Sequence, residues 1–243
     1  IFLDRDGVLN KERNNFTEQA LARLSQIYLE DKNWNDAIEV LKRLELEGDF
    51  PQNIVFAELN LMKSNYELDN YALAIGYAEK VLKNTKIEDA IKSDAQVIIA
   101  RSALSLNDKK KARLIYEEVQ QIATGSLAAE ALYYQAYFLN IDKNYEESNK
   151  KVQNLTRDYS GYKFYAAKGL VLRAKNLYEL EDSFQASYIL KIVIENFQQF
   201  DDVYEEAKSE LERIKVEESK RNSSINIDSI EQNIDQNNDL KVD

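Results

Sequence analysis

The chain has 243 residues, 31% of them charged, and a formal net charge of -11, so phosphate backbones are repelled and nucleic acid is not an expected partner. It has no His and no Cys, which removes imidazole bases, thiol nucleophiles, disulfides and nearly every zinc site. No apolar run reaches the roughly 20 residues that cross a bilayer, and the six Gly and one Pro are too few for a turn-rich β architecture.

The first fifteen residues, IFLDRDGVLNKERNN, carry two carboxylates two positions apart after a short apolar run. This stretch resembles motif I of the haloacid-dehalogenase-like phosphatases, in particular the sugar-bisphosphate and histidinol-phosphate branch. By that resemblance Asp4 would attack phosphorus, Asp6 would protonate the leaving oxygen, and both would help to hold Mg²⁺. The family also needs a Ser or Thr, a Lys or Arg, and an acidic pair on neighbouring parallel strands. No strand pattern follows Phe16.

An isolated motif cannot bring nucleophile, metal and phosphate together. We therefore interpret residues 1–15 as a phosphatase-motif-like fragment without its domain, left by a gene-joining event, a misassembled reading frame or an engineered fusion. The alternative hypothesis is a Mg²⁺-dependent phosphatase that acts on a sugar phosphate or histidinol phosphate through Asp4.

After this stretch, apolar residues recur at helical spacing along the chain. Thr17 is placed to cap the first helix, and Pro51 begins the third, where its missing N–H is tolerated. Gly76 and Gly169 fall inside predicted helices, and we expect each to mark a close helix contact. The pattern predicts helices over 17–31, 35–47, 51–68, 71–84, 88–106, 109–123, 127–142, 145–159, 162–180, 183–198 and 201–221.

Five segments share one pattern, in which a short polar turn is followed by a small residue and, four positions later, by an apolar one. The small residues lie 36 to 38 positions apart, at Ala37, Ala74, Ala112, Ser148 and Ala186. Each unit is therefore predicted to be a helix–turn–helix, because a small residue early in the second helix lets it pack closely on the first.

The last predicted helix, 201–221, is apolar on one side only, which suits a terminal cap with a solvated outer face. From Asn222 onwards Asn, Asp, Ser and Gln dominate, so too little apolar surface is present to offset ordering. We expect three parts: the fragment 1–15, a helical repeat domain over 16–221, and a disordered polar tail over 222–243.

The repeat resembles the tetratricopeptide (TPR) repeat, W-x2-L-G-x2-Y, then A-x3-F, then P. The best match is the first unit, with Leu21, Leu24, Ser25, Tyr28, Ala37 and Leu41. The second unit departs from the pattern, with Met62 and Lys63 near the small-residue site. Residues 127–198 look like the closing repeats of large bacterial cell-envelope TPR proteins. The resemblance, over about 17–215, implies an all-α solenoid of about five helix pairs with a C-terminal capping helix.

The same resemblance implies a protein that binds other proteins or peptides, with no enzyme activity and no cofactor. It favours the bacterial periplasm or an outer-membrane association, with the cytoplasm as the other possibility. Superimposing the units places seven residues on first-helix positions that usually line the concave groove: Asn60, Ser64, Arg101, Tyr133, Tyr137, Lys175 and Tyr178.

Aromatic side chains beside polar groups are typical of a peptide-binding groove, although each of these positions could also be a plain solvated helix face. We therefore predict a protein-interaction scaffold with a peptide or protein partner. The negative net charge favours a neutral or basic partner. The remaining alternatives are a purely structural array without a ligand and a non-repeat helical bundle.

Overall fold

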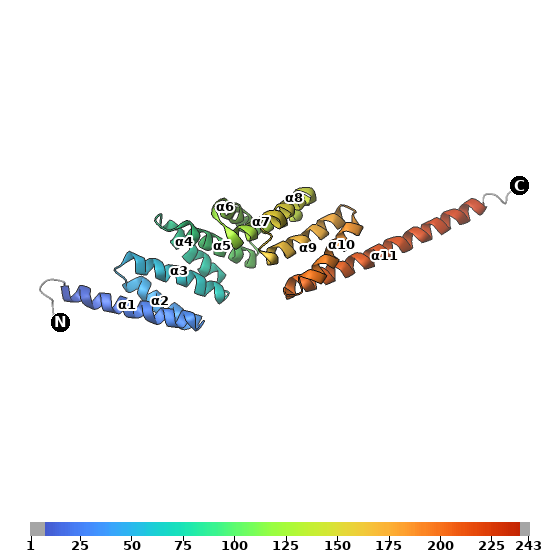
Figure 1. Ribbon diagram of the computed structural model, residues 1–243. Coiled ribbons are helices and arrows are strands. Elements are labelled where there is room, and N and C mark those ends of the chain that lie inside the picture. The colour runs from blue at the N-terminus through green and yellow to red at the C-terminus, as the bar shows by residue number, and fades with distance from the viewer. Residues whose placement is uncertain (1–7, 239–243) are drawn as a thin grey trace. The chain divides into compact units, whose positions relative to one another are not determined.

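The computed structural model describes the backbone of residues 8–238 and the side chains of residues 16–221. This part of the chain forms eleven helices and no strand (Figure 1). The helices are α1 (Val8–Glu30), α2 (Trp34–Glu47), α3 (Pro51–Glu67), α4 (Tyr71–Lys83), α5 (Asp89–Ser105), α6 (Lys109–Ile122), α7 (Gly125–Ile141), α8 (Tyr145–Asp158), α9 (Lys163–Glu179), α10 (Ser183–Asn196) and α11 (Asp201–Asn238). The predicted helical repeat is thereby confirmed.

The chain divides into two compact units, residues 1–131 and 132–243, with the boundary inside α7. The first unit has a core shared by α1, α2 and α3 and another shared by α3, α4 and α5. In the second unit α9, α10 and α11 share a core that includes Val193, Val203 and Ile214. Within each of these cores, helices that follow one another in the sequence bury their apolar faces together, as stacked repeats do.

The turn inside each helix pair has the same geometry in all five repeats. Its central residue has a positive φ, between 55° and 65°, at Lys32, Asp69, Asn107, Lys143 and Glu181. The next residue, which is the N-cap of the second helix, donates its N–H to the carbonyl five residues earlier. These N-cap residues are Asn33, Asn70, Asp108, Asn144 and Asp182. The bond satisfies a carbonyl that the end of the first helix would otherwise leave unpaired.

The small residue predicted in each second helix lies four positions after the N-cap and is fully buried in every repeat. Ser148 shows why a small side chain is needed, because its Oγ donates to the carbonyl of Ala136 on α7 at 2.8 Å. A larger side chain would push the second helix away from the first, and close packing would be lost.

Two predictions about the first helix are wrong, because α1 begins at Val8 rather than near residue 17. Thr17 therefore lies inside the helix and does not cap it. Glu18 is buried, and its carboxylate accepts hydrogen bonds from the N–H of Asp49 at 2.6 Å and from the side-chain amide of Asn53 at 2.7 Å. Glu18 thus supports the start of α3, which begins at Pro51 as predicted.

The two helical glycines differ from one another. A Cβ on Gly169 would lie 3.0 Å from a methyl group of Leu155 and 3.3 Å from one of Val152, which confirms the expected close contact between α9 and α8. A Cβ on Gly76 would meet nothing within 4 Å, so the same expectation is wrong for α4. At the other end of the chain, α11 continues to Asn238, past the residue 221 at which we predicted it to end.

Candidate functional site

The first unit contains a pocket of about 410 Å³, which we call the first-unit pocket. Most of its wall comes from α3 and α5, with contributions from α1, α7 and the first residue of α2. Its apolar and aromatic residues are Leu29, Trp34, Tyr66, Val97, Ile98 and Leu127. Its polar and charged residues are Asn60, Lys63, Glu67, Asp94 and Arg101. A pocket of this composition, apolar with a few polar groups, is typical of a binding site.

Two of the predicted groove residues, Asn60 and Arg101, line this pocket. Ser64 does not, because its side chain is fully buried between helices. The reason is a one-residue error in register. Arg101 lies seven residues before the N-cap of the helix that follows it, and so does Lys63. Ser64 lies six residues before its N-cap, and Ser102, at the same position in the next repeat, is also fully buried.

Sequence reasoning missed Lys63, Glu67, Asp94 and Trp34. The N-cap at each turn is the signal that could have found them, since it fixes the register of the first helices.

Arg101 is held in the pocket wall by a buried carboxylate. Its Nε donates to Glu130 at 2.7 Å and its Nη2 to the other carboxylate oxygen of Glu130 at 2.5 Å. Glu130 is only 1% exposed and also accepts from the hydroxyl of Tyr116 at 2.8 Å. A two-point contact of this kind fixes both the position and the plane of the guanidinium.

The Arg101–Glu130 pair belongs to a series that joins first helices of successive repeats. Lys63 of α3 pairs with Asp94 of α5 at 3.5 Å, and in the second unit Lys175 of α9 pairs with Glu206 of α11 at 2.7 Å. Arg101 of α5 pairs with Glu130 of α7 in the same way. All three cations are seventh before their N-cap, so the basic residues at this position carry a structural role that the sequence pattern alone did not indicate.

In the second unit, α7 presents a cluster of aromatic side chains. Tyr133 and Tyr137 are stacked with ring centres 6.5 Å apart, and the Nζ of Lys168 lies 4.9 Å from the centre of the Tyr133 ring. Tyr133 is only 7% exposed, and burial raises the pKa of its hydroxyl well above the ordinary value. Tyr137 is half-buried. Tyr137 can therefore offer a ring surface to a partner, and Tyr133 mainly supports it.

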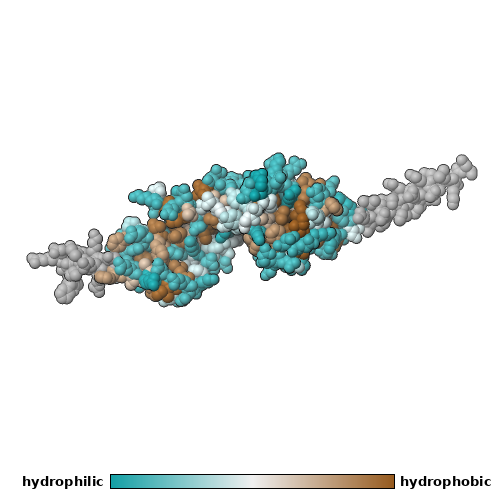
Figure 2. Space-filling model, viewed as in Figure 1, coloured by the Kyte–Doolittle hydropathy of each residue, from teal (hydrophilic) through white to brown (hydrophobic). Residues whose placement is uncertain are grey.

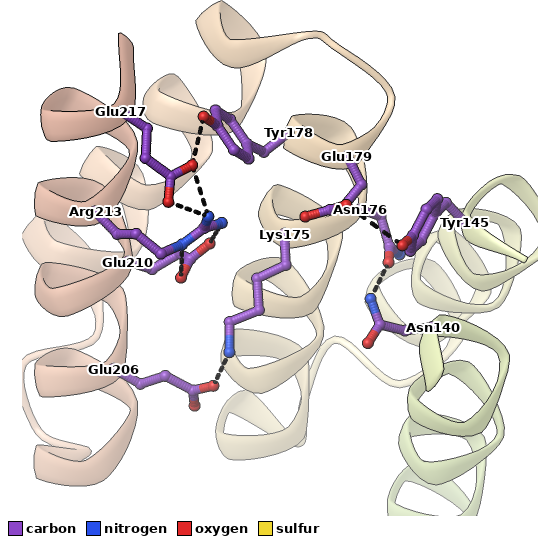
Figure 3. Close-up of polar contacts among 10 residues, drawn as sticks. All are labelled: Asn140, Tyr145, Lys175, Asn176, Tyr178, Glu179, Glu206, Glu210, Arg213 and Glu217. Atoms are coloured by element: carbon purple, nitrogen blue, oxygen red, sulfur yellow. Dashed lines mark hydrogen bonds and ion pairs between the residues drawn. The ribbon is translucent and has the colours of Figure 1, made fainter. Parts of the chain in front are cut away.

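The other two predicted residues, Lys175 and Tyr178, face α11 (Figure 3). The hydroxyl of Tyr178 donates to Glu217 at 2.8 Å, and the guanidinium of Arg213 lies 4.8 Å from the centre of its ring. Arg213 in turn pairs with Glu217 and Glu210 on its own helix. Both predicted residues are thus engaged by α11, and a partner would have to compete with these contacts.

The described side chains include no group of three or more His, Cys, Asp or Glu that could hold a metal ion. Asp4 and Asp6, the residues of the phosphatase alternative, lie outside the residues that the structure describes. None of the helices in the described part combines the length and the apolar character that a bilayer crossing requires.

No family model matches the chain, and no curated protein matches it by sequence. Solved structures do match. The MamA protein shares 14% identity and a TM-score of 0.58, with 74% of this chain and 91% of that chain covered. The quorum sensor NprR from B. thuringiensis, in its apo form, shares 15% identity and a TM-score of 0.61, with 84% of this chain and 64% of that chain covered. TPR-like repeats of a Podospora anserina kinesin light chain share 12% identity and a TM-score of 0.53, with 72% of this chain and 92% of that chain covered.

At this level of identity the comparison establishes the fold alone: an all-α solenoid of TPR type. The cell-envelope setting and the phosphatase motif find no support among these structures.

Proposed function

We propose that this chain, which has the fold of TPR proteins, is a protein-interaction scaffold that binds a peptide segment of its partner in the first-unit pocket. The observation that carries the proposal is the pocket itself, with its apolar wall and its clustered polar groups. Proteins of the same fold in the comparison are repeat proteins of the scaffold kind, which supports an interaction role over a catalytic one.

The chemistry of the wall favours one apolar side chain of the partner as the anchor. Leu29, Val97, Ile98 and Leu127 offer aliphatic surface, and burying a Leu- or Phe-sized side chain against it is worth about 1.5–3 kcal/mol. Trp34 is half-buried beside them, and a residue of this type often dominates an interface.

The polar groups of the pocket would set the orientation of the peptide. Lys63 and Asp94 are both partly exposed and only 3.5 Å apart, so each can exchange part of its ion pair for a contact with the peptide backbone or a charged side chain. The net charge of the chain, -11, favours a neutral or basic segment over an acidic one. The partner is therefore expected to present an apolar residue flanked by neutral or basic residues.

Trp34 gives a direct test, because it is the only tryptophan of the chain and lines the pocket. A phage-displayed random peptide library would be selected on the wild-type protein, and selected peptides without tryptophan would be titrated while Trp34 emission is recorded. We expect a saturable change in emission and weaker binding by Asn60→Arg, which places a bulky cation in the pocket.

Lys110→Ala, an exposed change on α6, is the matched control and should bind as the wild type does. Peptides that bind wild type and Asn60→Arg equally well, with no change in Trp34 emission, would show that the pocket is not the binding site. Failure to select any peptide would favour the purely structural array.

A further inference from the structure

The outer surface of α10 differs from that of every other second helix. Large apolar residues reach the surface of the molecule at several places, and on the face shown in Figure 2 they form separate patches among hydrophilic residues. On α10, however, Phe184 is 81% exposed and Tyr188 59% exposed, one helical turn apart. Ile192, partly buried, follows one turn later. We call these three residues the α10 stripe.

The repeat register shows that this stripe is not a requirement of the fold. Its residues are second, sixth and tenth after the N-cap Asp182. The same positions in the other four repeats are occupied by Asn35, Glu39, Arg43, Ala72, Gly76, Lys80, Lys110, Leu114, Glu118, Glu146, Lys150 and Asn154. Only Leu114 among these is a large apolar residue. Phe184 and Tyr188 also lie outside the core that α9, α10 and α11 share, so neither is needed to hold α10 in place.

We propose that the α10 stripe is a self-association surface, on which α10 of a second copy of this chain packs antiparallel. In an antiparallel pair whose two-fold axis passes midway between Phe184 and Tyr188, at the level of Ala186, Phe184 of each copy lies against Tyr188 of the other. The spacing of four residues makes the stripe complementary to itself, as a two-fold interface requires. The stripe forms a ridge of side chains spaced four residues apart, and ridges of this spacing interdigitate in the commonest class of helix–helix packing.

Charge supports this occupant and fixes the register. Lys191 and Glu181 are exposed, and neither forms an ion pair with another residue in the described part of the chain. In the antiparallel pair that joins Phe184 to Tyr188, Lys191 of each copy lies opposite Glu181 of the other. Gln185 and Ser187, which flank Ala186 at the level of the axis, are neutral, so no like charges meet near the axis.

The contact is small, since a single helix pair falls short of the ~800 Å² per partner that stable complexes bury. The net charge of -11 on each copy also opposes association, and physiological salt screens this repulsion beyond about 8 Å. We therefore expect a weak dimer, populated at high protein concentration.

Sedimentation equilibrium of the full chain, from low micromolar to near-millimolar concentration in physiological salt, tests the proposal. We expect the average mass to rise from the 28.2 kDa of one chain towards twice that value. Phe184→Ser combined with Tyr188→Ser should remain at the mass of one chain. Leu114→Ser, at the position on α6 equivalent to Tyr188, is the matched control and should associate as the wild type does. Far-UV circular dichroism melts check that the variants fold.

The register is tested by charge reversal. Lys191→Glu alone and Glu181→Lys alone should each weaken self-association about tenfold, because two attractive pairs become repulsive. An equimolar mixture of the two variants should recover association, since both pairs are then attractive again. Lysine is tolerated at position 181, because Lys32 and Lys143 occupy the equivalent position with the same positive φ.

A wild-type mass that stays at one chain over the whole range would overturn the proposal, including the case in which the stripe binds a different protein. Equal association by wild type and the Phe184/Tyr188 variant would also overturn it, because the dimer would then use another surface. A mixture that fails to recover would show that the antiparallel register is wrong.

Discussion

At the scale of single residues, Arg101 combines two roles, since it lines the first-unit pocket and neutralises the buried carboxylate of Glu130. We predict that Arg101→Ala destabilises the protein by ~3 kcal/mol, because it leaves the buried charge of Glu130 without its cation. This is the low end of the range for such a loss, and we choose it because Arg101 itself is one-third exposed. Chemical denaturation measures this. Lys63→Ala breaks the equivalent but exposed pair with Asp94 and should cost less than about 1 kcal/mol. Equal losses in the two variants would show that burial of Glu130 does not matter.

Glu18 is the residue whose effect on stability should depend on pH. Burial alone would raise its pKa, but hydrogen bonds from the N–H of Asp49, the amide of Asn53 and the N–H of Phe50 outweigh this and lower the pKa below its ordinary 4.5. A carboxyl whose pKa falls on folding stabilises the folded state above its unfolded pKa, and this contribution is lost as pH falls through the folded pKa.

We therefore predict that Glu18→Gln lowers the melting temperature at neutral pH and that its difference from wild type shrinks as the pH falls below the ordinary pKa of 4.5. Thermal melts from neutral to acidic pH check this. Glu39→Gln, an exposed change on α2, should show no such trend. A Glu18→Gln difference that is constant with pH would mean that the lost hydrogen-bond geometry, and not the charge, is responsible.

At the scale of helices, most boundaries could be predicted to within two or three residues because the apolar spacing and the small residues repeat. The turns themselves could not be read from composition, since their positive-φ residues are Lys, Asp, Asn and Glu rather than Gly. The fold tolerates these residues because the hydrogen bond from each N-cap closes the turn. The start of α1 escaped prediction because the polar run before Phe16 has no apolar stripe that the spacing rule could detect.

The two glycines inside helices should respond to alanine in different ways. Gly76→Ala meets no neighbour, so it should stabilise the protein by up to about 1 kcal/mol through helix propensity. Gly169→Ala gains the same propensity but forces Leu155 and Val152 to move, and it should therefore be clearly less stable than Gly76→Ala. Urea denaturation of both variants measures the difference. If the two gain equally, α9 and α8 are packed more loosely than the contacts indicate.

At the scale of the whole molecule, the repeat could be predicted from sequence because one small residue recurs in every unit, but the candidate site could not. A shift of one residue in the predicted register is enough to name the wrong pocket residue, as the choice of Ser64 in place of Lys63 shows. It also depends on contacts between residues about thirty positions apart, such as Arg101 with Glu130, which no local pattern reveals. The local spacing of apolar and small residues thus predicts the helices. The partner of a buried charge, by contrast, is known only once the structure is available.

The division of the chain into a repeat domain and a tail leads to the last prediction. The face of α11 that packs on α9 and α10 consists of Val203, Ala207, Leu211 and Ile214, all before residue 221. Deleting residues 201–243 removes these side chains and exposes the core beneath them, at a cost of about 1.5–3 kcal/mol for each large one. We expect this variant to melt several degrees lower or to aggregate.

Deleting only residues 222–243 leaves that apolar face complete, so the melting temperature should stay within about 2 °C of wild type. Calorimetry of the two deletions under one buffer condition makes the comparison. Because the longer deletion contains the shorter one, the difference between them isolates residues 201–221. An equal loss in both variants would place residues 222–243 inside the folded domain, and the predicted boundary at residue 221 would be wrong.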